Sequence, residues 1–257
     1  MKKADARTNR NESGPVRAQL LSVAKAYLRP WKRLAQVITN RPRLCIGRSP
    51  VSEYYGFDLG LPLHRYYIED FLRGVARNFV RGHVLEFQSD DYASSIGGDN
   101  INRLDIIHKE SSNPHATIVA DLTLPNDIPS DQYDCIICTQ VLHTVSAAET
   151  FLYETRRILK PGGVLLLAVP FLVMWGPDNN DLIRWTPLGL RRLLEKVFGP
   201  GTLGIYEYGN SLVAAADIRG FPSHYLTAAE KRYRDGRFSV QICAWAQKNT
   251  ITEMTAR

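Results

Sequence analysis

The chain has 257 residues, of which 44% are hydrophobic and 23% are charged. These values are ordinary for a globular protein and exclude a largely disordered chain. The longest apolar run, from Gly163 to Trp175, is shorter than the roughly 20 residues of a membrane-spanning helix. No apolar segment follows the basic start Met1-Lys2-Lys3, so we expect no secretory signal and a cytoplasmic protein.

The positive charge is confined to the first part of the chain. Residues 1–50 contain 12 Lys and Arg against only Asp5 and Glu12, whereas the remainder contains 20 Lys and Arg against 24 acids. Residues 51–257 are therefore mildly acidic as a whole, which argues against a nucleic-acid-binding groove on this part of the chain. We expect no nucleic-acid partner.

Residues 1–50 form a basic arm in this interpretation. Residues 1–15 are polar and we expect them to be disordered, whereas apolar residues recur at helical spacing from Val16 to Ile38, interrupted by Pro30. A basic amphipathic helix of this kind is typical of segments that lie on an anionic membrane or on a partner. A helix packed on its own domain, or a linker, is the alternative. Residues 51–247 then form the main domain and residues 248–257 a tail.

Helices and strands are expected to alternate through the main domain. This order predicts an α/β fold, a doubly wound and mostly parallel seven-stranded sheet with helices on both faces. The Pro161-Gly162-Gly163 segment is expected to end the helix before it as a glycine cap. The expected strands are 83–87, 101–107, 116–120, 133–139, 164–169, 203–208 and 239–246, and the expected helices are 63–77, a short one through Tyr92, 147–159 and 186–197.

The cysteines and histidines do not indicate a metal site or a disulfide. Cys135 and Cys138 are three residues apart in an expected strand, so their side chains should point to opposite faces of the sheet. The six histidines lack the spacing of a zinc site. We therefore expect buried, reduced cysteines and no metal.

Polar side chains follow the expected parallel strands, where ligands of such sheets bind. Glu86 ends the first strand, and Asp105 in the second comes 19 residues later. That spacing is typical of an acid that accepts hydrogen bonds from ribose hydroxyls. Asp121 follows the third strand, and Thr139 and His143 follow the fourth. This arrangement suits a ligand that contains adenosine.

Several short motifs follow one another through the main domain. They are Val84-Leu85-Glu86-Phe87, Leu104-Asp105-Ile106, residues 117–122, Tyr133-Asp134 with the three residues after it, residues 139–142 and, most specifically, Arg157-Ile158-Leu159-Lys160-Pro161-Gly162-Gly163-Val164. With these motifs, the chain resembles the class I S-adenosylmethionine-dependent methyltransferases over roughly residues 50–247. A Gly56–Glu69 segment also resembles the start of a small-molecule or glycan methyltransferase subfamily.

The resemblance implies S-adenosylmethionine as cofactor and a role for each matching residue. Glu86 would orient the loop under the methionine moiety, Asp105 would accept from the ribose, and Asp121 with Leu122 would flank the adenine. Arg65 would lie near the cofactor carboxylate. The implied cofactor-binding residues are Arg65, Tyr66 and Tyr67 as a lid, Glu86, Gln88, Asp105, Asp121, Leu122, and Thr139 with Gln140 on the sulfonium side.

The chain departs from the family in its glycine-rich first motif. Gln88 stands where the first glycine is expected, and Asp90 stands where the second is expected. Glycines normally let the backbone approach the ligand closely there. The departure motivates one alternative function, a catalytically weak scaffold or binding subunit.

His143 is the expected catalytic residue, as the base that removes a proton from the acceptor. A structural or cofactor-contacting histidine is the alternative. Asp181 and Arg184 are expected to bind substrate, although two residues three apart can also form a local ion pair. The sequence thus predicts methyl transfer to a hydroxyl or amine of a small molecule or glycan intermediate. A nucleic-acid methyltransferase that uses the basic arm is a further alternative.

Overall fold

The computed structural model describes residues 30–38, 48–176 and 180–249, in two compact units with a boundary after Arg48. In the first unit, residues 30–38 form a helix on which Trp31, Leu34 and Ile38 are exposed. The predicted amphipathic stripe before Pro30 lies outside the described residues. No helix in the described part of the chain is both long enough and apolar enough to span a membrane.

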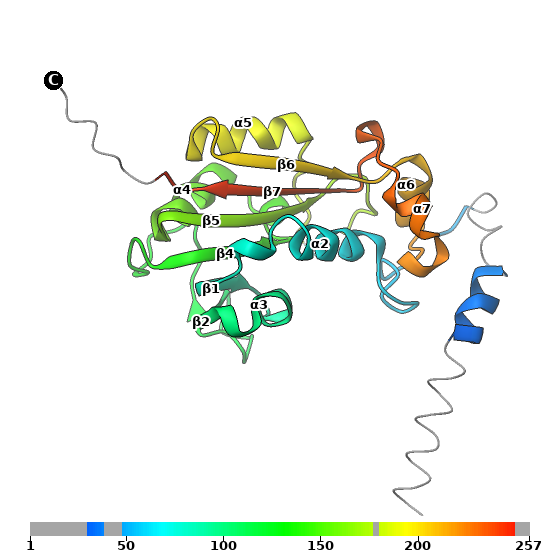
Figure 1. Ribbon diagram of the computed structural model, residues 1–257, viewed down its shortest axis with the longest axis horizontal. Helices are drawn as coiled ribbons and strands as arrows, with labels where there is room; N and C mark the ends of the chain where they lie inside the picture. Colours follow the sequence, from blue (N-terminus) through cyan, green and yellow to red (C-terminus); the bar gives the residue numbers. More distant parts are fainter. Residues whose placement is uncertain (1–29, 39–47, 177–179, 250–257) are drawn as a thin grey trace, which may run out of the picture. The chain divides into compact units, whose positions relative to one another are not determined.

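The second unit is built on one seven-stranded sheet (Figure 1). The strand order is β3-β2-β1-β4-β5-β7-β6. The strands β1 to β5 pair in parallel, and β7 is antiparallel to both of its neighbours, which confirms the predicted architecture. The strands are β1 Gly82–Phe87, β2 Ile101–His108, β3 Ile118–Val119, β4 Tyr133–Thr139, β5 Leu159–Pro170, β6 Leu203–Tyr208 and β7 Gln241–Gln247.

Helices cover both faces of the sheet. On one face α2 packs against β7 and α3 against β1 and β2, and on the other α4 and α5 pack against β5, β6 and β7 (Figure 1). The sequence did not predict α6 and α7, which pack on each other and follow β6. The helices are α2 Leu63–Arg73, α3 Asp91–Gly97, α4 Ala148–Ile158, α5 Pro187–Phe198, α6 Ser211–Ile218 and α7 Ala228–Arg232.

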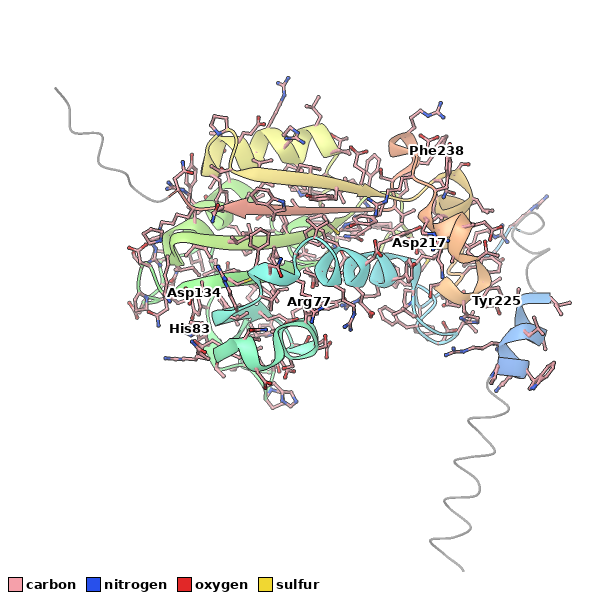
Figure 2. The ribbon with its side chains drawn as sticks, viewed as in Figure 1. Arg77, His83, Asp134, Asp217, Tyr225 and Phe238 are labelled. Atoms are coloured by element: carbon pink, nitrogen blue, oxygen red, sulfur yellow. The ribbon has the colours of Figure 1, made fainter. Side chains whose placement is uncertain are left out.

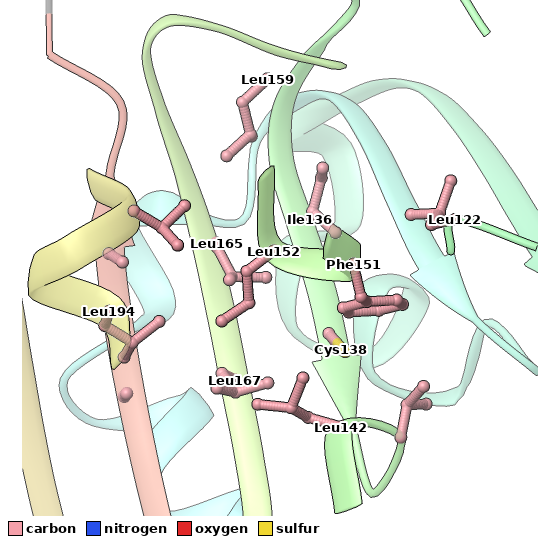
Figure 3. Close-up of a cluster of buried hydrophobic side chains, with 14 of the residues drawn as sticks. Leu122, Ile136, Cys138, Leu142, Phe151, Leu152, Leu159, Leu165, Leu167 and Leu194 are labelled. Atoms are coloured by element: carbon pink, nitrogen blue, oxygen red, sulfur yellow. The ribbon is translucent and has the colours of Figure 1, made fainter. Parts of the chain in front are cut away.

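A large apolar cluster lies between the sheet and the α4/α5 layer (Figure 3). Phe151 and Leu152 of α4 are buried there together with Ile136 of β4 and with Leu165 and Leu167 of β5. Burying one such side chain stabilises the fold by about 1.5–3 kcal/mol. This cluster holds β4 and β5 in place, and the polar loops that follow these strands begin from a rigid base.

The predicted glycine cap after α4 is wrong. The helix ends at Ile158, and Leu159 is already extended and begins β5. Gly162, with φ +81°, and Gly163 lie inside that strand, where the pairing with β4 shifts register. A Cβ on Gly163 would lie 2.8 Å from the carbonyl oxygen of Tyr133, so the second glycine is needed for close strand contact rather than for ending a helix.

Candidate active site

A cavity of about 300 Å³ opens where the parallel strands end. Ligands of doubly wound sheets bind at this edge, and the volume is at the lower end for small-molecule sites. Loops after β1, β4 and β5 and the start of α2 line it. The lining residues are Tyr55, Phe57, His64, Arg65, Gln88, Gln140, His143, Thr144, Pro170, Val173, Met174 and Asp181.

Two glutamines form the sharp turns directly after β1 and β4. Gln88 has φ +73° and Gln140 has φ +56°, both in the left-handed region that favours glycine. The carbonyl oxygen of Gln88 accepts a hydrogen bond of 2.6 Å from the side-chain amide of Asn113. The first motif therefore keeps the backbone conformation of a glycine although its residue is glutamine, and this is how the loop tolerates the departure.

Glu86 holds the loop that contains Gln88. Its side chain is buried and its two carboxylate oxygens accept from the backbone N–H groups of Tyr92, at 3.1 Å, and Ala93, at 2.7 Å. Burial raises the pKa of Glu86 to about 7, against the opposing effect of the two N–H donors. The carboxyl group thus caps α3 and fixes the turn, and it is absent from the cavity lining.

Arg65, on the first turns of α2, lines the cavity as expected. Its guanidinium donates to the Tyr92 hydroxyl at 2.7 Å and lies 5.8 Å from the ring centre of Phe57. These contacts hold a positive charge at the cavity wall. A carboxylate is the natural partner for such a guanidinium.

The structure does not place the two tyrosines after Arg65 at the cavity. Tyr67 is buried against Tyr208, with ring centres 5.3 Å apart, and its hydroxyl donates to the carbonyl of Lys231. Tyr66 has the ammonium group of Lys231 over its ring at 4.4 Å. Consecutive residues of a helix point about 100° apart, so α2 directs these rings toward β6 and α7. The lid predicted for them is not formed.

Asp105 also lies away from the cavity. It is opposite Leu85 in the β1/β2 pairing, three residues before β2 ends at His108. Asp105 lies inside its strand as predicted, but at this position its side chain is not among the residues that line the cavity. The geometry does not support the predicted contact with ribose.

The Asp105 carboxylate is instead the centre of a buried polar cluster. It is 2.7 Å from His83 Nε2, and it accepts from the Tyr133 hydroxyl at 3.3 Å and from the Thr117 hydroxyl at 3.3 Å. Burial would raise its pKa, but the hydrogen bond from His83 and the charge of Arg103 outweigh burial, so the pKa is lowered. These contacts connect β1, β2 and β4.

Asp121 and Leu122, which were predicted to flank the adenine, and Thr139, which was predicted on the sulfonium side, also lie outside the cavity lining. Asp121 borders a second, shallow cavity together with Asp105, and its carboxylate accepts from the backbone and side chain of Thr123. Leu122 belongs to the apolar cluster on the α4/α5 face. Thr139, the last residue of β4, is buried. Of the ten predicted cofactor residues, the cavity brings together Arg65, Gln88 and Gln140.

The predicted catalytic and substrate residues are grouped at this cavity. His143 and Asp181 line it, and Arg184 forms an ion pair with Asp181. Burial lowers the pKa of His143 to about 4, so its ring is neutral at pH 7. Its Nδ1 is buried without a hydrogen-bond partner among the described residues. Burial would raise the pKa of Asp181, but the hydrogen bond from Arg184 holds it below its usual value.

Sequence reasoning missed two residues that bear on this site. His64, the second residue of α2, lines the cavity, and its Nδ1 is 3.6 Å from the carboxylate of Asp217 on α6. Gln241 of β7 is fully buried beside Gln140, with 3.4 Å between their amide groups. Neither α6 nor the antiparallel neighbour of β5 was assigned to the site, because no motif marks them.

Cys135, Cys138 and Cys243 are buried thiols, and burial raises their pKa well above the usual value. No group of three or more His, Cys, Asp or Glu side chains within the described ranges is arranged to hold a metal ion.

Residues 82–167 match the sequence profile of the family described as "Methyltransferase domain". No curated protein matches the chain. A solved structure described as an S-adenosylmethionine-dependent methyltransferase, possible histamine N-methyltransferase, from Thermotoga maritima shares the fold with a TM-score of 0.51, at 12% identity over 73% of this chain and 92% of its own. An S-adenosylmethionine-dependent methyltransferase from Archaeoglobus fulgidus aligns with a TM-score of 0.49, at 10% identity over 77% of this chain and 100% of its own.

The sheet order and the cavity at the strand ends define the class I methyltransferase fold, and the family match lies on that sheet. Residues 82–167 match a methyltransferase domain, and the chain has the fold of S-adenosylmethionine-dependent methyltransferases. The cavity residues fit this cofactor: Arg65 offers a cation for its carboxylate, and the buried Oε1 of Gln140 is left without a hydrogen-bond partner among the described residues.

Proposed function

We propose that this enzyme methylates a hydroxyl or amine of a small molecule or glycan intermediate, and that the acceptor enters the cavity beside His143. The observation that carries the proposal is the buried Nδ1 of His143, which has no partner among the described residues although the ring lies at the cavity wall. A buried polar atom without a partner costs stability, and such atoms cluster at functional sites. A group that donates an O–H or N–H to this wall would relieve that cost.

S-adenosylmethionine supplies an electrophilic methyl group on a positively charged sulfur when it is bound. Arg65 would hold its carboxylate, and Gln88 and Gln140 would meet it at the two strand ends. Much of the acceleration in such a displacement comes from holding the two reactants in line. The turns after β1 and β4, fixed by Glu86 and by the buried core, provide that positioning.

The neutral ring of His143 suits an orienting contact with the acceptor. With a pKa of about 4, the ring keeps a free lone pair at pH 7, but it takes up a proton less readily than an ordinary histidine. Asp181, whose charge is balanced by Arg184, lines the same cavity and would accept a second hydrogen bond from the acceptor. The prediction that His143 acts as the base stays a prediction.

The size and charge of the site favour a small acceptor. A cavity of about 300 Å³ holds a small molecule or a sugar, whereas a nucleic acid would need a basic surface around it. The 24 acids against 20 Lys and Arg after residue 50 do not provide one. This supports the small-molecule assignment over the nucleic-acid alternative.

Methyl transfer from radiolabelled S-adenosylmethionine to a panel of hydroxyl and amine acceptors tests the proposal. We expect transfer to at least one monosaccharide, nucleotide-free glycan intermediate or small amine, and none to RNA or DNA. His143→Ala should lower turnover by about 10²–10⁴-fold while calorimetry finds cofactor affinity unchanged. The matched control is His115→Ala, because His115 is exposed and lies outside the cavity lining. Labelling of nucleic acid alone would overturn the small-molecule assignment.

We further propose that the protein is cytoplasmic and that the basic arm attaches it to an anionic membrane surface. The support is the excess of cations in residues 1–50 and the exposed Trp31, Leu34 and Ile38 on the helix over residues 30–38. Exposed apolar side chains among cations are typical of helices that lie in a membrane interface. Attachment would bring the cavity to acceptors that are linked to lipid.

A further inference from the structure

A second histidine faces the cavity and is backed by a buried acid. His64 and Asp217 are 5% and 2% exposed, and His64 Nδ1 lies 3.6 Å from Asp217 Oδ1. Figure 2 shows Asp217 on α6, beyond the ends of the sheet strands. The two residues lie on α2 and α6, two helices that contact each other. They are 153 positions apart in the chain, and the fold brings them together.

The pairing fixes which ring nitrogen faces the cavity. Nδ1 is turned toward Asp217, and the two nitrogens are on different sides of an imidazole ring, so Nε2 is left for the cavity that His64 lines. The rings of Tyr55 and Phe57 pack edge-on against His64, with centroids 6.2 Å and 5.9 Å away. These contacts restrict rotation of the ring.

A carboxyl group is costly to bury without partners. The contacts of Asp217 among the described residues give it no lysine or arginine partner, and its Oδ2 is buried without a hydrogen bond. The acid therefore has its evident use in holding His64, since a carboxylate that accepts from Nδ1–H keeps the Nε2 lone pair free and stabilises the ring when it gains a proton.

We propose that His64 is the catalytic base of the methyl transfer and that Asp217 is its positioning residue. This inference rests on the proposed function. The proton passes from the acceptor oxygen or nitrogen to Nε2 of His64. On a hydroxyl acceptor, the electron pair freed on oxygen would form the new bond to the methyl carbon. On an amine, the nitrogen lone pair would form that bond, and the N–H pair would stay on nitrogen as its proton leaves. In both cases the pair of the broken carbon–sulfur bond stays on sulfur. His143, which also lines the cavity, then orients the acceptor.

The 3.6 Å separation of Nδ1 and Oδ1 is within ion-pair range but longer than a hydrogen bond. Catalytic hydrogen bonds are often long before the substrate binds and shorten in the complex. His64 is also in the first turn of α2 and Asp217 is in the last turn of α6, so small movements of two helix ends are enough to close the pair.

The first test needs neither cofactor nor acceptor. The side-chain nitrogen NMR shifts of His64 in the full-length protein report its tautomer. We expect hydrogen on Nδ1 in the wild type, and we expect Asp217→Asn to move a large part of the population to hydrogen on Nε2. Hydrogen on Nε2 in the wild type would overturn the assignment, because no lone pair would then face the cavity.

The second test is kinetic and uses the acceptor found with the panel above. His64→Asn keeps a hydrogen-bonding side chain but cannot take the proton, so kcat should fall by about 10²–10⁴-fold, with cofactor affinity within about twofold of wild type. Asp217→Asn should lower kcat and leave the acceptor KM nearly unchanged. His115→Asn is the matched control and should leave both constants unchanged.

Near-wild-type turnover of His64→Asn would overturn the proposal. If His64→Asn fails to fold, judged by thermal unfolding, the tautomer measured in the wild type decides. If the wild type methylates no acceptor, the proposed function fails by that result, while the tautomer still shows whether the His64–Asp217 pair is set up as a base.

Discussion

The carboxylate of Glu86 accepts the backbone N–H of Ala93 at 2.7 Å, and this contact ties the end of β1 to the start of α3 across the turn at Gln88. A buried acid is thereby placed under the loop whose Gln88 lines the cavity. Because burial raises the pKa of Glu86 to about 7, its protonation changes in the physiological range.

Glu86 should make stability depend on pH. Its pKa is raised from 4.5 to about 7 in the folded protein, so the folded state binds the proton more tightly than the unfolded state. The stabilisation is complete below about pH 4.5 and is lost as pH rises through about 7, a change on the order of 3 kcal/mol. Urea denaturation across this range should show stability falling with pH, and Glu86→Gln should remove most of this slope.

Glu110→Gln is the control for that measurement, since Glu110 is exposed and should keep the wild-type slope. An identical pH dependence in wild type and Glu86→Gln would show that the acid is not titrating in this range.

Asp105 should matter to stability rather than to the cofactor. Its carboxylate is buried and bonded to His83, Thr117 and Tyr133. Asp105→Asn removes the charge from these hydrogen bonds and should lower the free energy of unfolding by about 1.5–3 kcal/mol. Calorimetric affinity for S-adenosylmethionine should stay within about twofold of wild type. The matched control is Asp99→Asn, which removes one charge at an exposed position before β2. A large loss of cofactor affinity with unchanged stability in Asp105→Asn would show that Asp105 binds the ribose after all.

The turn at Gln88 should accept glycine and reject a β-branched residue. With φ at +73°, a non-glycine residue here is strained by about 1–2 kcal/mol, whereas glycine adds about 0.5–1 kcal/mol of unfolded-state entropy. The two effects nearly cancel, so Gln88→Gly should change the free energy of unfolding by less than about 1 kcal/mol. Gln88→Val should destabilise by more than Gln88→Gly, and equal stability of the two variants would argue against the left-handed turn.

The basic arm should carry membrane attachment and not the fold. Deleting residues 1–40 should leave thermal unfolding and cofactor affinity unchanged, because the compact unit with the sheet begins at Ser49. The same deletion should abolish salt-sensitive flotation with anionic vesicles, to which each Lys or Arg contributes at most roughly 1 kcal/mol. If the full-length protein does not float with anionic lipid at low salt, membrane attachment by the arm is contradicted. If the truncated chain unfolds, the arm contributes to the folded core.

The sequence alone was enough to predict the sheet and the residues at which β1 and β4 end. Alternating buried strands and amphipathic helices follow from local hydrophobic periodicity, and the Arg157–Val164 segment marks one strand almost alone. Gln88 and Gln140 were found because they directly follow strands, and His143 was found because it lies in the loop after β4.

Other parts of the site depend on packing that no local pattern records. The role of Asp105 was mispredicted because a count of residues does not say which side chains a strand position faces. Tyr66 and Tyr67 were misplaced because the rotation of α2 is set by its contacts with β6 and β7. The His64–Asp217 pair joins two helices from opposite ends of the domain. Only the closed fold brings them together.

Calorimetric titration of the full-length protein with S-adenosylmethionine tests the central claim, that the cavity after β1 and β4 is the cofactor site, most directly. The account predicts one binding event per chain, and loss of at least about tenfold in affinity when Arg65→Ala removes the cation from the cavity wall, since a hydrogen bond to a charged group is worth about 1.5–3 kcal/mol. No binding by the wild type at millimolar cofactor, or equal affinity of wild type and Arg65→Ala, would contradict it.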